Sequence, residues 1–498
     1  NANHIFNAIH SSMRQWGSSL NHNGMSFFLA TVPEGTQLYH GTWKEERVDG
    51  MEWLAFEPEH SLVFTHRRPS RGGPRRGRPG KSPGGDMERP FHEGPGSGHP
   101  PDFIPGWLHT YKANKDLRLL YIDGMSAGKT DNGTLDSQDL VLLNSTEPHR
   151  GMWEYERALG LCEMAQKEWE GRIYGIVRME AGFEIILCNF SKDVDLVRVT
   201  RAAGPDDRDF DGFSNKIGHF RYMEAVAARY PGIGGDRVRL DYDNFVSAFA
   251  YPLELFISAS EIDEAPPLPR LVNISSDDLA IVRSDVRNMI LSQDAVTATR
   301  ESFNWQRAAD MIVARYSKPL QYLTSDLVRK NTTLLSTYLE VLLRPFIDYS
   351  ARLPLDEAAR CSAQFASNVP AANTSLAAAA VHAIADKICS VLSSALSSIS
   401  DESDDDAAGP KIRKAGLANA VFKLDGLVDY LQWTSWKQCR GCGDDEICFV
   451  PIWPFGAVED HKRPRCLDAD SLVSRMGYWG IWWGRPPPDK GEKGGKRG

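Results

Sequence analysis

A chain of 498 residues, 42% of them hydrophobic, is too long for one core and suggests two or three domains. Its formal net charge of −9 argues against general nucleic-acid binding, so we expect no specific nucleic-acid partner. No apolar run reaches the roughly 18–20 residues that a membrane helix requires, so we expect no membrane span.

The N-terminal part of the chain alternates short apolar strands with few helices. Residues 4–20 carry apolar side chains at helical spacing and predict one helix. Another helix is expected at 153–168. Strands are expected at residues 25–32, 37–42, 53–56, 117–122, 173–178, 183–190 and 194–199. Together these elements predict an α+β domain over residues 1–205.

A basic stretch, residues 66–105, interrupts this domain. Its Arg and Lys residues alternate with Gly and Pro, and nothing in it can build a core. We interpret it as a flexible basic insertion. A basic arm that binds acidic polymers or cell-wall anions is the alternative.

The rest of the chain has a different composition. Residues 206–410 are expected to form a mainly helical domain, because apolar residues recur at helical spacing in 279–290 and 334–342. Residues 411–498 are rich in Cys and Trp, and we expect them to form a separate region with a disordered tail.

The eight cysteines are an even number, as disulfides require. By proximity in sequence we expect Cys162 to pair with Cys188 and Cys361 with Cys389. The remaining four are expected to be oxidised, although a four-thiolate zinc site is the alternative: Cys439, Cys442, Cys448 and Cys466. We therefore expect no metal.

Several features favour a secreted, extracellular eukaryotic glycoprotein. The chain starts at Asn1 without a methionine, which fits a secretory protein whose leader has been removed. The paired cysteines and 13 tryptophans agree with this. Six Asn-x-Ser/Thr sequons point the same way: Asn132, Asn144, Asn189, Asn273, Asn331 and Asn373.

Four segments carry a resemblance to a known fold. A strand at 37–42 ends in His40-Gly41-Thr42, and three further segments follow it at 52–56, 117–123 and 182–188. Their order and character resemble the ADP-ribosyltransferase fold of NAD-using enzymes, in its histidine-first branch. The whole chain also resembles an uncharacterised secreted fungal family, through the segments at 19–28 and 453–456.

The resemblance implies a role for each motif residue. His40 would bond a ribose hydroxyl of NAD, and the Gly41 main chain would hold the carboxamide, with Thr42 beside it. Trp53 or Phe56 would stand where the family usually has a tyrosine. Glu184 would be the catalytic residue, because it opens an apolar strand after a glycine-containing turn.

These residue types suit cleavage of the bond between nicotinamide and ribose. The reaction generates a cationic, oxocarbenium-like sugar, which a carboxylate beside the ribose stabilises. Glycine lets the main chain approach the carboxamide closely, and an aromatic face can contact the leaving ring. We therefore expect a secreted NAD-consuming enzyme, an ADP-ribosyltransferase or an NAD glycohydrolase, with a protein or other acceptor.

Alternative interpretations stay open for the site and for the function. His40 can be a hydrogen-bonded histidine at a strand end, and Glu184 can pair with Arg178 across a turn. One functional alternative is a secreted glycan hydrolase that uses paired carboxylates, either Asp136 with Asp139 or Asp241 with Asp243. The other is a non-catalytic cell-surface binding protein.

Overall fold

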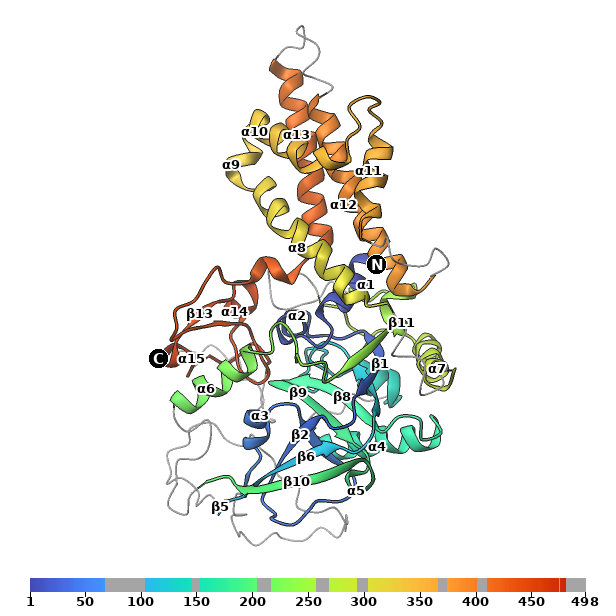
Figure 1. The fold of residues 1–498 in the computed structure, drawn as a ribbon, viewed down its shortest axis with the longest axis vertical. Helices are drawn as coiled ribbons and strands as arrows, with labels where there is room; N and C mark the ends of the chain where they lie inside the picture. The colour runs from blue at the N-terminus through green and yellow to red at the C-terminus, as the bar shows by residue number, and fades with distance from the viewer. Residues whose placement is uncertain are drawn as a thin grey trace, which may run out of the picture. The chain divides into compact units, whose positions relative to one another are not determined.

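The structure is a computed structural model that describes residues 1–67, 104–145, 153–203, 216–256, 268–292, 303–365, 374–400, 410–473 and 475–480. The chain divides into two compact units (Figure 1). The helical unit comprises Asn1–Ser12, Asp241–Pro252 and Arg300–Gln438. The sheet unit comprises Met13–Leu240, Leu253–Thr299 and Cys439–Gly498.

The sheet unit is built on one mixed sheet. Its strands are β1 (Ser26–Val32), β2 (Gln37–Thr42), β3 (Glu52–Ala55), β6 (Trp107–Ala113), β7 (Leu117–Ile122), β8 (Gly175–Glu180), β9 (Gly182–Leu187) and β10 (Val194–Arg201). They lie in the order β10-β6-β2-β3-β9-β8-β7-β1 (Figure 1). Each neighbouring pair is antiparallel except β7 and β8, which are parallel.

The core of the sheet unit lies around β8 and β9, whose residues are all buried. Burial on both faces explains why these strands contain apolar runs instead of an alternating pattern. The helix α4 (Glu154–Lys167) packs against β8, and the disulfide between Cys162 and Cys188 ties that helix to the end of β9.

The sheet opens between β2 and β3. One residue pair, Tyr39 with Ala55, joins these two strands, whereas β2 pairs with β6 from Gln37 to Thr42. On its other side β3 pairs with β9 along its whole length. Past Tyr39 the two strands therefore separate, and their side chains and main chains border a gap.

Short elements complete the sheet unit. The helices are α2 (Gln15–Leu20), α3 (Pro58–Leu62), the π-helix η1 (Ser137–Leu142), α5 (Phe190–Asp193), α6 (Lys216–Ala227), α7 (Ser276–Ser292), α14 (Val458–Lys462) and α15 (Ala469–Leu472). The short strands are β4 (His66–Arg67), β5 (Ile104–Pro105), β12 (Ile447–Phe449) and β13 (Arg465–Leu467). The strand β11 (Arg239–Ser247) carries the chain from the sheet unit into the helical unit.

A second apolar cluster holds the C-terminal segment onto the sheet unit. Trp16 of α2, Met223 of α6 and Phe449 of β12 belong to it and are buried. The antiparallel strands β12 and β13 are each tied by a disulfide to the segment before β12, through Cys439–Cys448 and Cys442–Cys466.

The helical unit is a bundle around one long helix, α12 (Leu376–Ser400), which packs against α1, α8, α10, α11 and α13. The bundle consists of α1 (Ala2–Ser11), α8 (Trp305–Leu323), α9 (Asp326–Arg329), α10 (Thr332–Leu343), α11 (Pro354–Ala363), α12 and α13 (Pro410–Leu431). Three 3₁₀ turns also belong to it: η2 (Ala248–Ala250), η3 (Arg344–Phe346) and η4 (Thr434–Lys437).

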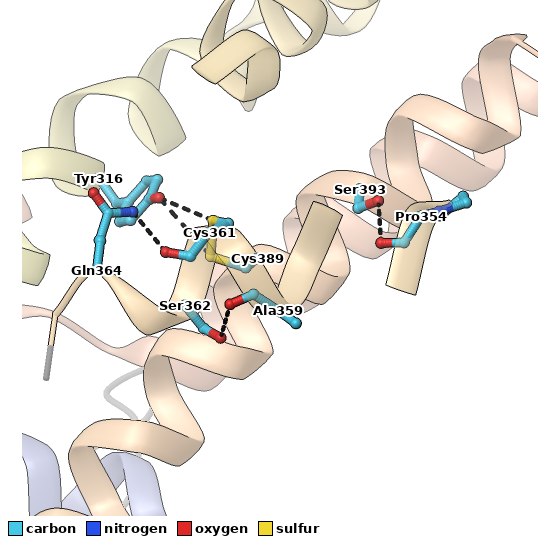
Figure 2. Close-up of a disulfide and its surroundings, with 8 residues drawn as sticks. All are labelled: Tyr316, Pro354, Ala359, Cys361, Ser362, Gln364, Cys389 and Ser393. Carbon is cyan, nitrogen blue, oxygen red and sulfur yellow. Dashed lines mark hydrogen bonds between the residues drawn. A yellow bond between two sulfur atoms is a disulfide. The ribbon is translucent and has the colours of Figure 1, made fainter. Parts of the chain in front are cut away.

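A buried disulfide joins α11 to α12 inside this bundle. Cys361 and Cys389 are both fully buried, and the hydroxyl of Tyr316 lies 3.3 Å from the Cys361 sulfur (Figure 2). A hydrogen bond from the Gln364 amide to the Cys361 carbonyl closes the end of α11 beside it.

The helix α12 also bears on the expected absence of a membrane span. Within the described residues, its segment Leu376–Ile399 alone is long and apolar enough to cross a membrane, by length and composition. The central helix of a bundle can also be long and apolar, because neighbouring helices bury its surface on several sides.

Several expectations from the sequence can be compared with this fold. The mixed α+β composition, with a sheet towards the N-terminus and helices and disulfides towards the C-terminus, is as predicted. All eight cysteines are paired as disulfides, including the two pairs expected by proximity. Of the basic insertion at 66–105, residues 68–103 lie outside the described residues, as does the tail from 481 onwards.

The division of the chain differs from the three consecutive domains expected at 1–205, 206–410 and 411–498. The single helix expected at 4–20 is two helices, α1 and α2, because Met13 between them adopts a positive φ of 53°. The boundary between the units falls at this break. The helix α7, expected in the helical domain, belongs to the sheet unit.

Candidate functional site

A cavity of about 450 Å³ lies in the sheet unit where β2 and β3 separate. Residues of both strands line it, together with α3, the start of α4 and the ends of β8 and β9 that meet at their hairpin. Trp453 closes part of the wall from the C-terminal segment. Such a volume lies in the range of about 300–1,000 Å³ typical of small-molecule sites.

The structure brings most of the predicted site residues to this cavity. His40, Gly41, Thr42, Trp53 and Glu184 all line it, although 144 positions separate His40 from Glu184. Phe56, the other residue considered for the tyrosine position, lies in the core with 1% of its surface exposed. It is not among the described residues that line the cavity. Trp53 is therefore the aromatic residue of β3 at the site.

His40 holds the edge of the gap in the sheet. Regular pairing places Tyr39, Ala55 and Glu184 on one face, so alternation alone would turn His40 to the other face. At the gap, however, His40 Nδ1 donates to the carbonyl oxygen of Trp53 at 2.7 Å. This side-chain bond stands where main-chain pairing has ended, and it leaves Nε2 unprotonated.

The imidazole of His40 is neutral because of its surroundings. Burial lowers its pKa to about 4, although the hydrogen bond to the Trp53 carbonyl favours the protonated form. The rings of Phe190 and His109 lie 5.5 and 6.2 Å away, centre to centre. His40 is therefore a hydrogen-bonded histidine, as the alternative interpretation expected. The same hydrogen bond and ring contacts hold its side chain at the cavity.

Gly41 allows α3 to approach β2 closely. A Cβ atom at Gly41 would overlap the carbonyl oxygen of Ser61, so only glycine fits between the strand and the helix. Proline at the first helical position of α3, Pro58, fixes where the helix begins. Two further residues of this segment, Ser61 and Phe64, line the cavity.

Glu184 is buried and bound to an arginine. It pairs with Arg178 across the β8–β9 hairpin, and Arg178 Nη2 donates to Glu184 Oε1. This is the pairing considered as an alternative for Glu184. Burial alone would raise the pKa of this carboxyl group, but Arg178, Lys129 and His60 hold that pKa well below its usual value. Glu184 is therefore a fixed carboxylate, 4% exposed, on the cavity wall.

Charged residues surround Glu184. Arg178 also donates to Glu154, the first residue of α4, and Lys129 Nζ lies 2.6 Å from Glu180 and 3.8 Å from Glu154. The ring of Trp453 lies 4.9 Å from Lys129 Nζ. Arg157 Nη1 also lies 3.5 Å from Glu154, so each of the three glutamates contacts at least one basic side chain.

One histidine faces two of these carboxylates. Burial disfavours the charged form of His60, but the neighbouring carboxylates of Glu184 and Glu180 raise its pKa. Its Nε2 lies 4.0 Å from Glu184 Oε2. The residue comes from α3, five positions after the strand β3 ends at Ala55.

Sequence reasoning missed the roles of Lys129, Glu180 and His60. The sequence contains a signal for Glu180. Arg178 and Glu180 alternate on a strand that is otherwise apolar, and Glu184 follows four residues after Glu180. Lys129 follows β7 in a loop, and only the tertiary structure places it beside Glu180.

The carboxylates considered for a glycan hydrolase have structural partners away from the cavity wall. Asp136 accepts from Arg270, and Asp139 receives two bonds from Arg157. Asp243 accepts from the indole of Trp305. Asp241 accepts main-chain bonds from the residues that follow it. None of these four aspartates is among the described residues that line the cavity.

The comparisons with known proteins cover the segment that builds the cavity. A family described as YPL277C N-terminal domain matches residues 1–102 and 92–208. The chain is 27% identical to the uncharacterized protein YOR389W of Saccharomyces cerevisiae, over 92% of this chain and 83% of that protein. It is 36% identical to the uncharacterized protein YPL277C of the same yeast, over 41% of this chain and 44% of that protein. No solved structure matches.

Proposed function

We propose that the protein is a secreted NAD-consuming enzyme, an ADP-ribosyltransferase or an NAD glycohydrolase, that cleaves the bond between nicotinamide and ribose. The observation that carries this proposal is the convergence of His40, Gly41 and Glu184 on one cavity. Water as the acceptor makes the reaction a hydrolysis, and a protein or other nucleophile makes it a transfer.

The state of Glu184 supports the proposed chemistry. As the nicotinamide leaves, positive charge develops on the ribose, and a carboxylate held in place beforehand stabilises that charge without reorganisation. Arg178 fixes Glu184 and keeps it ionised, so that its negative charge is in place for the sugar. The cavity wall is thus suited to a cationic transition state.

The opposite wall offers groups that could hold the substrate. His40 Nε2 can accept a ribose hydroxyl, since Nδ1 is engaged with Trp53. The Gly41 main chain and the Ser61 hydroxyl can hold the carboxamide. The rings of Trp53 and Phe64 supply aromatic surface for the leaving nicotinamide.

An ADP-ribosyltransferase-like fold for the sheet unit is part of the proposal. Of the four segments that carry the resemblance, three form the neighbouring strands β2, β3 and β9, and the fourth forms β7 in the same sheet. Secretion is likewise proposed, and the four disulfides and the sequons support it.

The test is release of nicotinamide from NAD by the purified chain and by a Glu184→Gln variant. Glutamine keeps the shape of the side chain but removes its charge, and the expected loss of rate is about 10²–10³-fold. The substitution also removes one of two carboxylates on Arg178. Its cost to stability should stay below the roughly 3–5 kcal/mol of an unpaired buried charge, because Glu154 remains.

Glu154→Gln is the matched control, because it removes the other carboxylate on the same arginine. Its stability should fall to a similar extent, whereas nicotinamide release should fall less than about tenfold. Both variants are compared below their unfolding temperatures. If the wild-type chain neither releases nicotinamide nor binds NAD at millimolar concentration by calorimetry, the proposal is overturned.

A non-catalytic binding protein is the second candidate function. Trp53 stands where the resemblance leads one to expect a tyrosine, and Glu184 is already paired. Binding of NAD without release of nicotinamide is the result that selects this function over the enzyme.

A further inference from the structure

Three buried side chains converge at the inner wall of the cavity. His60 of α3, Glu180 at the end of β8 and Glu184 of β9 are 5%, 3% and 4% exposed. One nitrogen or oxygen atom from each lies within 4.8 Å of the corresponding atoms of the other two. An imidazole and two carboxylates in this arrangement are a familiar set of metal ligands.

The orientation of His60 turns Nε2 towards the two glutamates. Its Nδ1 lies 2.7 Å from the Ala181 carbonyl oxygen, to which it donates. In the neutral ring this bond leaves Nε2 free to bind a metal ion, and a main-chain acceptor of this kind is the usual outer partner of a metal-bound histidine. Within the described residues, Nε2 has no hydrogen-bond partner, although it is buried.

The carboxylate oxygens that face His60 Nε2 favour a positive charge there, which a proton or a metal ion can supply. The distance of 4.0 Å between His60 Nε2 and Glu184 Oε2 is too long for a hydrogen bond. It is below the roughly 4.4 Å that can separate two ligands of one ion at about 2.2 Å. A metal ion bound here would displace the proton that the carboxylates favour on His60.

The second oxygen of each glutamate is already used. Glu180 Oε2 accepts from Lys129 and Glu184 Oε1 accepts from Arg178. These bases orient the carboxylates and keep them ionised, and they leave Glu184 Oε2 directed towards His60.

We propose that His60, Glu180 and Glu184 bind a divalent transition-metal ion of the zinc class, with the fourth coordination position open to the cavity. The histidine nitrogen and the small number of oxygen ligands favour zinc over magnesium or calcium. This site differs from the expectation that the protein holds no metal. It depends on the geometry of the three residues alone.

A consequence for activity rests on the proposed function. An ion on Glu184 neutralises the charge that would stabilise the sugar cation, so a bound metal inhibits nicotinamide release. The metal is therefore a regulatory ligand of the cavity.

The direct test is metal binding by the full-length protein. After treatment with a chelator and removal of the chelator, Zn²⁺ is titrated calorimetrically, and Co²⁺ is used as a visible-absorption probe of a four-coordinate site. We expect one ion per chain, and loss of more than about 100-fold in affinity for His60→Ala and Glu180→Gln. His40→Ala and Glu154→Gln, which change a histidine and a glutamate of the same cavity, should still bind one ion.

The wild-type titration decides the proposal even if His60→Ala fails to fold. Absence of a stoichiometric Zn²⁺ site and of the Co²⁺ band in the wild-type chain overturns it, as does unchanged affinity in a folded His60→Ala protein. If the ion binds and nicotinamide release persists at saturation, only the inhibitory consequence is overturned. If the protein releases no nicotinamide, the Zn²⁺ titration still tests the metal site. Failure of the proposed function can therefore be told apart from failure of the metal site.

Discussion

At the scale of single residues, the site depends on side chains whose contacts fix them before any ligand binds. His40 is tied to the Trp53 carbonyl, and Glu184 to Arg178. Gly41 is required because a side chain there would overlap the main chain of Ser61. A structural bond and a role at the cavity are therefore compatible for the same residue, since preorganisation is what makes such a group effective.

The two aromatic residues of the β3 segment allow a matched prediction. Trp53 lines the cavity and Phe56 lies in the core. Trp53→Ala should weaken NAD binding by roughly 1–3 kcal/mol, the range for losing a large aromatic contact, with a smaller change in turnover. Phe56→Leu should lower the free energy of unfolding by about 1 kcal/mol and leave NAD affinity within twofold.

Calorimetric titration with NAD and chemical unfolding of both variants check this pair. Equal loss of NAD affinity in the two variants would show that Trp53 acts through the fold and not through contact with the ligand.

At the scale of elements, the junction between β1 and β7 contains a buried acid. Asp123 follows β7, its main chain bonds to Ser26 at 3.1 Å, and its Oδ1 accepts the Ser26 amide at 2.8 Å. Burial raises the pKa of Asp123 to about 7, against the Ser26 hydrogen bonds, which favour the ionised form. The folded protein therefore binds this proton more tightly than the unfolded chain, where the pKa is about 3.9.

This shift predicts a pH dependence of stability. The stability that the protein gains from protonated Asp123 is fully present below about pH 4. It is lost as the pH rises towards about 7, and the free energy of unfolding falls by up to about 4 kcal/mol. The Asp123→Asn variant keeps the acceptor for Ser26 but cannot ionise, so its free energy of unfolding should change less over that interval. Urea unfolding of both proteins from pH 4 to 8 measures the difference, and parallel curves would contradict the assignment.

At the scale of the whole molecule, each unit carries its own crosslinks. Cys361–Cys389 lies within the helical unit, while Cys162–Cys188 and the two C-terminal disulfides lie within the sheet unit. No described disulfide joins the two units.

Removal of one crosslink should therefore affect one unit. Replacing Cys361 and Cys389 together by alanine opens a loop of 28 residues and should cost about 3 kcal/mol. We expect a lower unfolding temperature for the helical unit by calorimetry, with NAD binding retained. The matched Cys162→Ala, Cys188→Ala protein opens a loop of 26 residues in the sheet unit and should lose NAD binding at a lower temperature. The reverse pattern would refute independent stabilisation.

The sequence by itself determined the local features of this protein. Apolar runs bounded by turns predicted β1, β2, β7 and β10 closely, because strand formation depends on nearby residues. The pairings Cys162–Cys188 and Cys361–Cys389 were predictable, since each partner is near in sequence. The motif residues His40, Gly41, Trp53 and Glu184, singled out through the resemblance, line one cavity, and their role there stays a prediction.

Only the tertiary structure decided how distant segments meet. Met13 breaks the helix expected at 4–20, and the two halves belong to different units, which helical spacing cannot reveal. Lys129, Glu154 and Glu180 join Glu184 although they come from a loop, a helix and a strand. Buried charges attract partners through space and not along the chain, so their pairing, and the site they build, depends on the packed fold.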